Sequence, residues 1–97
     1  MRVRWLARAT RALVSAYDFI AQDNPAAAKE FFRYLLSSTE RLTEFPQTDR
    51  AGRVPGTREL VLVKYPYIVP YRIEGLEIQI LHVLHNSRNW PTALPPR

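Results

Sequence analysis

The side chains best suited to chemistry lie close together near the end of the sequence: His82, His85, Arg88 and Trp90. Imidazole titrates near neutral pH, so either histidine could act as a general acid or base. The two histidines are three positions apart, and on a β-strand an odd separation sends side chains to opposite faces. We therefore expect no shared metal site and no cofactor. The alternative to a chemical role is that each histidine is an ordinary polar side chain at a strand end.

Other signatures of catalysis are absent from the sequence. There is no cysteine, which excludes disulfides, thiolate nucleophiles and cysteine metal sites. Ser87 lies two positions after His85, but no Gly-x-Ser-x-Gly motif surrounds it, so a serine hydrolase has little support. The glycines occur singly and form no phosphate-binding loop. We expect Trp90 to be a packing residue, with an exposed contact as the alternative.

The sequence is strongly basic, with a formal net charge of +5. Every basic residue except Lys29 and Lys64 is an arginine, whose planar guanidinium suits bidentate binding of phosphate or carboxylate. Such a surface favours an acidic partner, either nucleic acid or an acidic protein segment. The alternative is an ordinary soluble surface with a high isoelectric point.

A small fold must position these side chains. With 97 residues the chain can bury one hydrophobic core, so we expect a single domain spanning residues 1–97. No apolar run is long enough to span a membrane, and Arg8 and Arg11 interrupt the N-terminal segment too early for a signal peptide. We therefore expect a cytoplasmic protein without a membrane partner.

The first half of the sequence predicts a short strand followed by two helices. Alternation over residues 2–6 predicts a strand with its arginines on one face. Apolar residues at helical spacing predict a first helix from about residue 9 to residue 22. Asn24 followed by Pro25 is typical of a helix start, and a second helix should run from Pro25 to near Glu44, just before the next proline. The short link between the helices requires an antiparallel hairpin.

The second half predicts three strands, at residues 57–63, 67–73 and 76–85, joined by hairpin-length connections into an antiparallel meander. Alternation turns four residues of the middle strand toward the helices: Tyr67, Val69, Tyr71 and Ile73. Pro70 cannot donate a ladder hydrogen bond, so we expect a bulge or a missing bond beside it. Helices followed by strands predict an α+β fold, with the helices on one face of the sheet and the other face free to carry a site.

Five segments match a known family in order and spacing. They are the opening strand running into residues 7–10, Tyr17-Asp18-Phe19-Ile20-Ala21 with Asn24-Pro25-Ala26-Ala27-Ala28, Arg41-Leu42 to Phe45-Pro46, Gly56-Thr57-Arg58-Glu59-Leu60, and Tyr71-Arg72-Ile73 leading to residues 80–85 and Arg88-Asn89-Trp90-Pro91. Through them the chain resembles the RelE/ParE superfamily of bacterial type II toxin-antitoxin toxins, most closely its ParE branch. The resemblance implies an N-terminal strand and an antiparallel two-helix hairpin packed on one face of a twisted antiparallel β-sheet.

The superfamily divides between two activities. Toxins of the RelE kind cleave mRNA on the ribosome and need cations on the open face of the sheet to stabilise charge on the phosphate. Laid on that pattern, the positions of the cations are held by Glu59, Val61, Ile68 and Asn86. Toxins of the ParE kind poison DNA gyrase by trapping its cleaved DNA complex and are not enzymes. The resemblance therefore implies gyrase poisoning without a catalytic residue. Ribosome-dependent mRNA cleavage is the alternative, since a slip in register would restore Arg58, Arg72 or Arg88.

The resemblance also implies partners. A cognate, ParD-like antitoxin would wrap the basic and partly apolar surface with an acidic amphipathic segment, and operator DNA would be reached only through that antitoxin. For the gyrase contact the expected residues are Arg58, Arg72, His82, His85, Arg88 and Trp90. Alternatively, Arg58 and Arg72 only form surface ion pairs with Glu59, Glu74 or Glu77. A third possibility for the whole protein is an inactive toxin fold that acts only in transcriptional autoregulation with its antitoxin.

Overall fold

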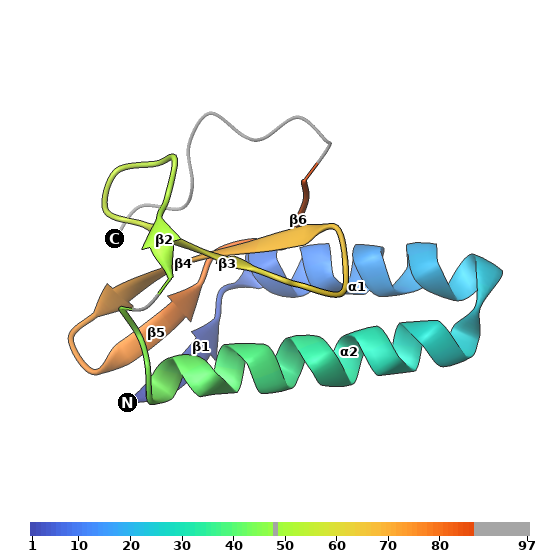
Figure 1. The fold of residues 1–97 in the computed structure, drawn as a ribbon, viewed down its shortest axis with the longest axis horizontal. Helices are drawn as coiled ribbons and strands as arrows, with labels where there is room; N and C mark the ends of the chain where they lie inside the picture. The colour runs from blue at the N-terminus through green and yellow to red at the C-terminus, as the bar shows by residue number, and fades with distance from the viewer. Residues whose placement is uncertain (48, 87–97) are drawn as a thin grey trace.

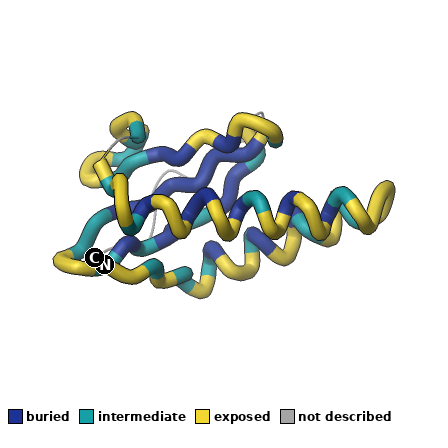
Figure 2. The backbone as a smooth tube through the Cα atoms, turned by 60° about the horizontal axis from the view of Figure 1, so that its bottom comes forward, coloured by how far each residue is buried: buried dark blue, intermediate teal, exposed yellow. Residues whose placement is uncertain are grey.

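The computed structural model describes residues 1–47 and 49–86. The elements are, in chain order, β1 (Arg2–Trp5), α1 (Ala7–Asp23), α2 (Pro25–Glu40), the 3-10 helix η1 (Arg41–Thr43), β2 (Arg50–Ala51), β3 (Arg58–Val61), β4 (Tyr67–Glu74), β5 (Glu77–Ile80) and β6 (Leu84–His85). Figure 1 shows α1 and α2 running antiparallel, and Figure 2 shows both helices across one face of the strands. The predicted α+β order of helices followed by strands is confirmed, with β1 leading the chain.

A single residue, Asn24, joins the two helices. Its backbone N–H donates to the carbonyl oxygen of Ile20 at 3.0 Å and so ends α1. Its side-chain oxygen accepts a hydrogen bond from the N–H of Ala27 at 3.1 Å, while Pro25, which has no N–H, takes the first helical position. The predicted restart at Pro25 and the antiparallel hairpin are therefore confirmed.

The end of α2 differs slightly from the prediction. The α-helix ends at Glu40, and the 3-10 helix η1 continues the path to Thr43. The N–H groups of Glu44 and Phe45 both donate to the carbonyl oxygen of Arg41, at 3.1 Å each. The helical path therefore stops before Pro46, as expected for residues that precede a proline.

The sheet has the strand order β1-β5-β4-β3-β2, and β6 pairs with β4. Strands β3, β4 and β5 form the predicted antiparallel meander. Strand β1, however, runs parallel to β5, from Arg2 beside Glu77 to Trp5 beside Ile80, so the sheet is mixed and not purely antiparallel as expected. The parallel pairing is possible because the helical hairpin and strands β2, β3 and β4 separate β1 from β5 in the chain, which gives a long crossover connection.

The core lies between the helices and the sheet. Phe31 and Leu35 of α2 are fully buried against the residues of β4 that were predicted to face the helices: Tyr67, Val69, Tyr71 and, partly buried, Ile73. The opposite side of β4 is also buried, at Ile68, Pro70 and Arg72. The expectation of a face left free is therefore wrong along β4. One reason is that Leu84 pairs with Ile68 and adds an apolar side chain to that face.

Neither helix in the described residues is long and apolar enough to cross a membrane.

Candidate functional site

The third predicted strand is interrupted, and the interruption creates the most distinctive local structure of the chain. Strand β5 pairs Ile80 with Tyr71, and β6 pairs Leu84 with Ile68. Between these pairs β4 moves three residues (71 to 68) while its partner moves four (80 to 84). One residue is therefore extra on the partner strand, which defines a β-bulge at His82 and Val83, hereafter the bulge.

Pro70 stands beside the bulge and explains its position. The N–H of Leu81 donates to the carbonyl oxygen of Pro70 at 2.9 Å. Pro70 has no N–H to return the second bond of the pair, so the regular ladder ends there. The prediction of a bulge or a missing bond beside this proline is confirmed.

The bulge is closed by a hydrogen bond between neighbouring residues. The N–H of Val83 donates to Nδ1 of His82 at 2.9 Å. The same nitrogen lies 3.2 Å from the carbonyl oxygen of Val83, but one nitrogen cannot accept and donate at once, and the shorter contact assigns it the acceptor role. Burial, and to a lesser extent the positive charge of Arg8, lower the pKa of His82, while the backbone of Val83 opposes them. The lowered pKa and the acceptor role of Nδ1 both favour the neutral form of the ring.

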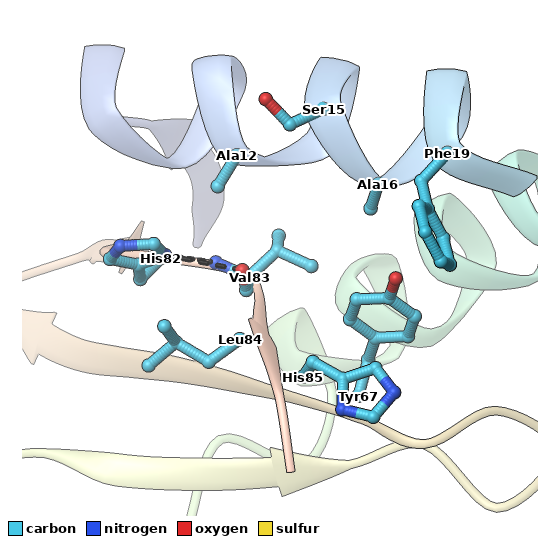
Figure 3. Close-up of a pocket in the computed structure, with 9 residues that line it drawn as sticks. All are labelled: Ala12, Ser15, Ala16, Phe19, Tyr67, His82, Val83, Leu84 and His85. Atoms are coloured by element: carbon cyan, nitrogen blue, oxygen red, sulfur yellow. Dashed lines mark hydrogen bonds between the residues drawn. The ribbon is translucent and has the colours of Figure 1, made fainter. Parts of the chain in front are cut away.

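Both histidines line one cavity of about 250 Å³ between α1 and the bulge. Figure 3 shows the residues around this histidine cavity, which are Ala12, Ser15, Ala16, Phe19, Tyr67, His82, Val83, Leu84 and His85. The expectation that His82 and His85 point to opposite faces is wrong, because the extra residue of the bulge changes the alternation between them. The bulge thus brings together two predicted site residues that a regular strand would separate.

The ring of His85 is held by a series of aromatic contacts. It packs edge-on against Tyr67, with the ring centroids 5.2 Å apart and the planes at 79°. The ring centroids of Tyr67 and Phe31 are 5.3 Å apart, and those of Phe31 and Tyr65 are 5.0 Å apart. Tyr65 also contacts Tyr34, with 5.5 Å between the centroids. Offset and edge-on ring pairs of this kind are favourable beyond their buried area. These contacts connect the residues that line the histidine cavity to Phe31 in the hydrophobic core.

Metal chemistry has no support in the part of the chain that the structure describes. Within residues 1–47 and 49–86, no three histidine, aspartate or glutamate side chains come together in a group that could hold a metal ion. The arrangement around the two histidines is suited to binding, since it offers a hollow with both apolar and polar walls.

Two of the three predicted arginines, Arg58 and Arg72, lie away from the histidine cavity. Arg58 donates to the carbonyl oxygens of Gln47 at 3.2 Å and Asp49 at 2.9 Å. Arg72 is 7% exposed, and its Nε donates to the side-chain oxygen of Gln79 at 2.9 Å. Both arginines line a second cavity of about 220 Å³, beside β2. The predicted site residues therefore divide between two places, and Arg88 and Trp90 lie outside the described residues.

The alternative interpretation, in which Arg58 and Arg72 only pair with glutamates at the surface, holds only in part. Arg72 lies 3.9 Å from the carboxylate of Glu74, a long ion pair. Arg58 is bound by backbone carbonyls, as described above, and Glu59 is bound by two other arginines. Glu77 is bound by Arg2 and Arg4, at 3.2 and 3.5 Å.

The sequence did not reveal the importance of Glu59. Its side chain is 2% exposed, and it accepts hydrogen bonds from Arg50 at 2.9 and 3.1 Å and from the backbone N–H of Arg53 at 2.8 Å. We refer to Glu59, Arg50 and Arg53 as the Glu59 cluster. Its signal in the sequence is only an acidic residue that follows several arginines, which does not say that this carboxylate is the buried one.

On the described strands, the face of the sheet opposite the helices carries Arg2, Arg4, Arg50 and Arg72, and each of these arginines is paired with a glutamate. Glu59 pairs with Pro70, and Val61 pairs with Ile68, so these side chains share that face. Arg58 pairs with Tyr71 and therefore belongs to the helix-facing side. Strand register thus groups Glu59, Val61 and Ile68, which are three of the four positions that the resemblance assigns to cations, and here they are an acid and two aliphatic residues.

A further surface feature lies on the outer side of the helical hairpin. An apolar groove of about 300 Å³ is lined by Leu13, Val14, Tyr17 and Phe32, and we call it the hairpin groove. Val14 is 52% exposed and Phe32 is 39% exposed, and the rings of Tyr17 and Phe32 meet edge-on at 6.2 Å. The helical periodicity that predicted the two helices did not indicate this exposed groove.

Comparisons with known proteins agree with this fold. Residues 3–90 match the family model described as ParE toxin of type II toxin-antitoxin system, parDE. The chain is 41% identical over 93 residues to Y4kP of Sinorhizobium fredii, a protein described as a candidate toxin, with 96% of both chains covered. It is 31% identical over 87 residues to Toxin RelE2 of Caulobacter vibrioides, covering 90% of this chain and 97% of that protein. Among solved structures it is similar to a chain of the chromosomal ParDE TA system from P. aeruginosa, with a TM-score of 0.76, 29% identity, and 86% and 92% of the two chains covered.

Proposed function

Because the chain belongs to the ParE toxin family of type II toxin-antitoxin systems, we propose that it arrests growth by trapping the cleaved DNA complex of DNA gyrase. In this proposal the toxin is not an enzyme, and it acts in the cytoplasm, where its target is found. The observation that carries the choice of target over mRNA is the composition of the sheet face opposite the helices.

That face is poorly suited to cleaving RNA. Stabilising the charge that develops on a phosphate needs cations or hydrogen-bond donors aimed at it. Glu59, which shares the face with Val61 and Ile68, contributes a carboxylate that is already bound by arginines. Arg2, Arg4 and Arg50 also lie on this face, but they are paired with Glu77 and Glu59, and Arg72 is buried and bonded to Gln79. These observations support a binding mechanism over a catalytic one.

Ribosome-dependent mRNA cleavage remains the second candidate. The observation in its favour is the 31% identity to a protein named Toxin RelE2. An inactive toxin fold that only regulates transcription with its antitoxin is the third candidate, because loss of toxicity would leave the fold unchanged.

We propose that the antitoxin is ParD-like and docks an acidic amphipathic helix in the hairpin groove. The groove offers exposed apolar side chains, including Val14 and Phe32, which match the apolar stripe of such a helix. Arg11 and Lys29 are exposed and lie one turn before Val14 and Phe32, where they favour acidic side chains. Asp18, one turn after Val14, is exposed and acidic, in contrast to these two residues. An acidic partner helix would therefore place its carboxylates near Arg11 and Lys29 and away from Asp18.

For the gyrase contact we propose the histidine cavity together with Arg58, Arg88 and Trp90. His85 is partly exposed and can present its ring to a partner. Arg72 is too buried to touch a target directly, so in this proposal it contributes by fixing Gln79.

The deciding experiment compares two reactions of the purified toxin. In the first, gyrase and supercoiled plasmid are incubated with toxin and scored for trapped cleaved DNA, and in the second, ribosome-bound mRNA is scored for cleavage. We expect trapped DNA, prevented by prior addition of the cognate antitoxin, and intact mRNA. Cleaved transcripts with unaffected gyrase would establish the second candidate. The absence of growth arrest on expression would establish the third.

A further inference from the structure

We infer that His82 is a positioning residue: by closing the bulge through Nδ1, it turns the side chain of His85 into the histidine cavity. The purpose of that cavity rests on the proposed function, since the cavity is part of the proposed gyrase contact. The mechanism rests on the geometry of the strand alone.

The register of the strands defines what the bulge does. If the pairing of β4 with β5 continued without an extra residue, Tyr67 would lie opposite Leu84. In the structure Tyr67 lies opposite His85. A shift of one residue exchanges the two faces of a strand. Without the bulge, Leu84 would occupy the place beside Tyr67, and His85 would turn away from α1.

The bulge needs a hydrogen-bond acceptor at a defined position. Val83 is 5% exposed and joins the hydrophobic core, so its N–H must be satisfied within the protein. In a bulge the extra residue is left without a partner on the opposite strand. Nδ1 of His82 supplies the acceptor at 2.9 Å. The Nδ1 atom of His82 is therefore used by the backbone of the bulge, and the role that we assign to His82 is structural.

The position of His85 then follows from packing. Its ring stands edge-on to Tyr67, which is itself supported by Phe31 in the core. A contact residue held in this way loses little conformational freedom when it binds, which favours affinity. His82 thus acts on the target contact through His85.

The test compares three variants in the full chain, released from a co-expressed antitoxin. His82→Asn keeps an oxygen at the position of Nδ1 and can still accept from Val83, whereas His82→Leu fills similar space without an acceptor. His85→Asn is the matched control, because it removes the proposed contact and leaves the bulge intact.

Two measurements are made on each variant. NMR reports the contact between the rings of Tyr67 and His85 and the hydrogen exchange of the Val83 amide, and the gyrase assay reports the toxin concentration that gives half-maximal trapping. We expect His82→Asn to stay close to the original protein in both. We expect His82→Leu to lose the ring contact, to expose the Val83 amide to exchange, and to need about tenfold more toxin, as His85→Asn does.

The inference is overturned if His82→Leu keeps the ring contact and the protected amide, or if His82→Asn fails as fully as His82→Leu. Should the original protein trap no gyrase, the proposed function fails, while the NMR results still decide whether His82 positions His85.

Discussion

At the bulge, the backbone N–H of Val83 is bound by a neutral ring on the adjacent residue, at 2.9 Å. Beside β2, the backbone N–H of Arg53 is bound by the carboxylate of Glu59, at 2.8 Å and six residues along the chain. In both regions one side chain accepts a hydrogen bond from a backbone N–H that lies outside the regular strand pairing. The first acceptor is uncharged and local, whereas the second is a buried charge that also binds Arg50. We therefore expect the two regions to differ in how strongly their stability depends on that side chain.

The largest expected effect comes from a substitution of Phe31, the core residue that supports Tyr67 beside the histidine cavity. Phe31→Ala deletes a fully buried ring that contacts both Tyr65 and Tyr67, so we expect a loss of about 3–5 kcal/mol in the free energy of unfolding. Urea unfolding measures the loss. In the folded fraction, NMR signals of His85 should shift while those of Glu59 stay, and equal shifts at both sites would show that the two regions are not independent.

The Glu59 cluster should be the more sensitive region to a change of a single acceptor. Glu59→Gln places an amide NH2 against one of the groups that donate to the carboxylate, and we expect a loss of about 2–3 kcal/mol, typical of hydrogen bonds to a charged group. Chemical denaturation measures it. Glu77→Gln is the matched control, because Glu77 also binds two arginines, but its side chain is 15% exposed against 2% for Glu59. An equal effect of the two substitutions would contradict the role of burial.

The bulge should respond less, and it should respond to acid. His82→Leu leaves the buried N–H of Val83 without an acceptor, and we expect a loss of about 1–2 kcal/mol, largely restored in His82→Asn.

The original protein should also lose stability as the pH falls below 6.5. The lowered pKa of His82 means that the unfolded chain takes up a proton first, and the loss from this group stops once the pH is below the folded-state pKa. Arg8 on α1 acts in the same direction. Thermal unfolding across this pH range should show that His82→Asn loses less stability in acid than the original protein. An unchanged loss of stability would assign the effect to another group.

The side of the sheet near β2 should respond in the opposite direction. The hydroxyl of Tyr71 lies 2.8 Å from the carbonyl oxygen of Pro46 and 3.1 Å from the carboxylate of Asp49. Burial and that carboxylate raise the pKa of Tyr71, so above pH 10 the unfolded chain loses its proton first and stability should fall as the pH rises. Tyr71→Phe should cost about 1 kcal/mol at neutral pH and reduce the alkaline loss. Equilibrium unfolding at neutral and alkaline pH tests both effects, and an alkaline loss as large in Tyr71→Phe as in the original protein would contradict the assignment.

The sequence predicted those parts of the fold that depend on local chemistry. Asn24 and Pro25 mark a helix start by their own hydrogen-bonding groups, and Pro70 disturbs a ladder because it lacks an N–H. The sequence could not show which face of the strand each histidine points to. One extra residue between them reverses the alternation, and the location of that residue depends on the pairing with β4.

The sites were harder to predict for a related reason. Which carboxylate is buried depends on strand pairing, which places Arg50 beside Glu59 in neighbouring strands β2 and β3. The division of Arg58 and His85 between two cavities likewise follows from tertiary packing, and no spacing in the sequence encodes it.

The parallel pairing of β1 with β5 has a consequence for synthesis of the toxin. The first strand, with Trp5 beside Ile80, cannot find its place until residue 80 has left the ribosome. At about 5–20 residues per second the N-terminal strand waits several seconds without its partner. Contacts between such distant parts of a chain also slow folding. The order in which the ribosome delivers the strands therefore delays the moment at which a newly made toxin is fully folded.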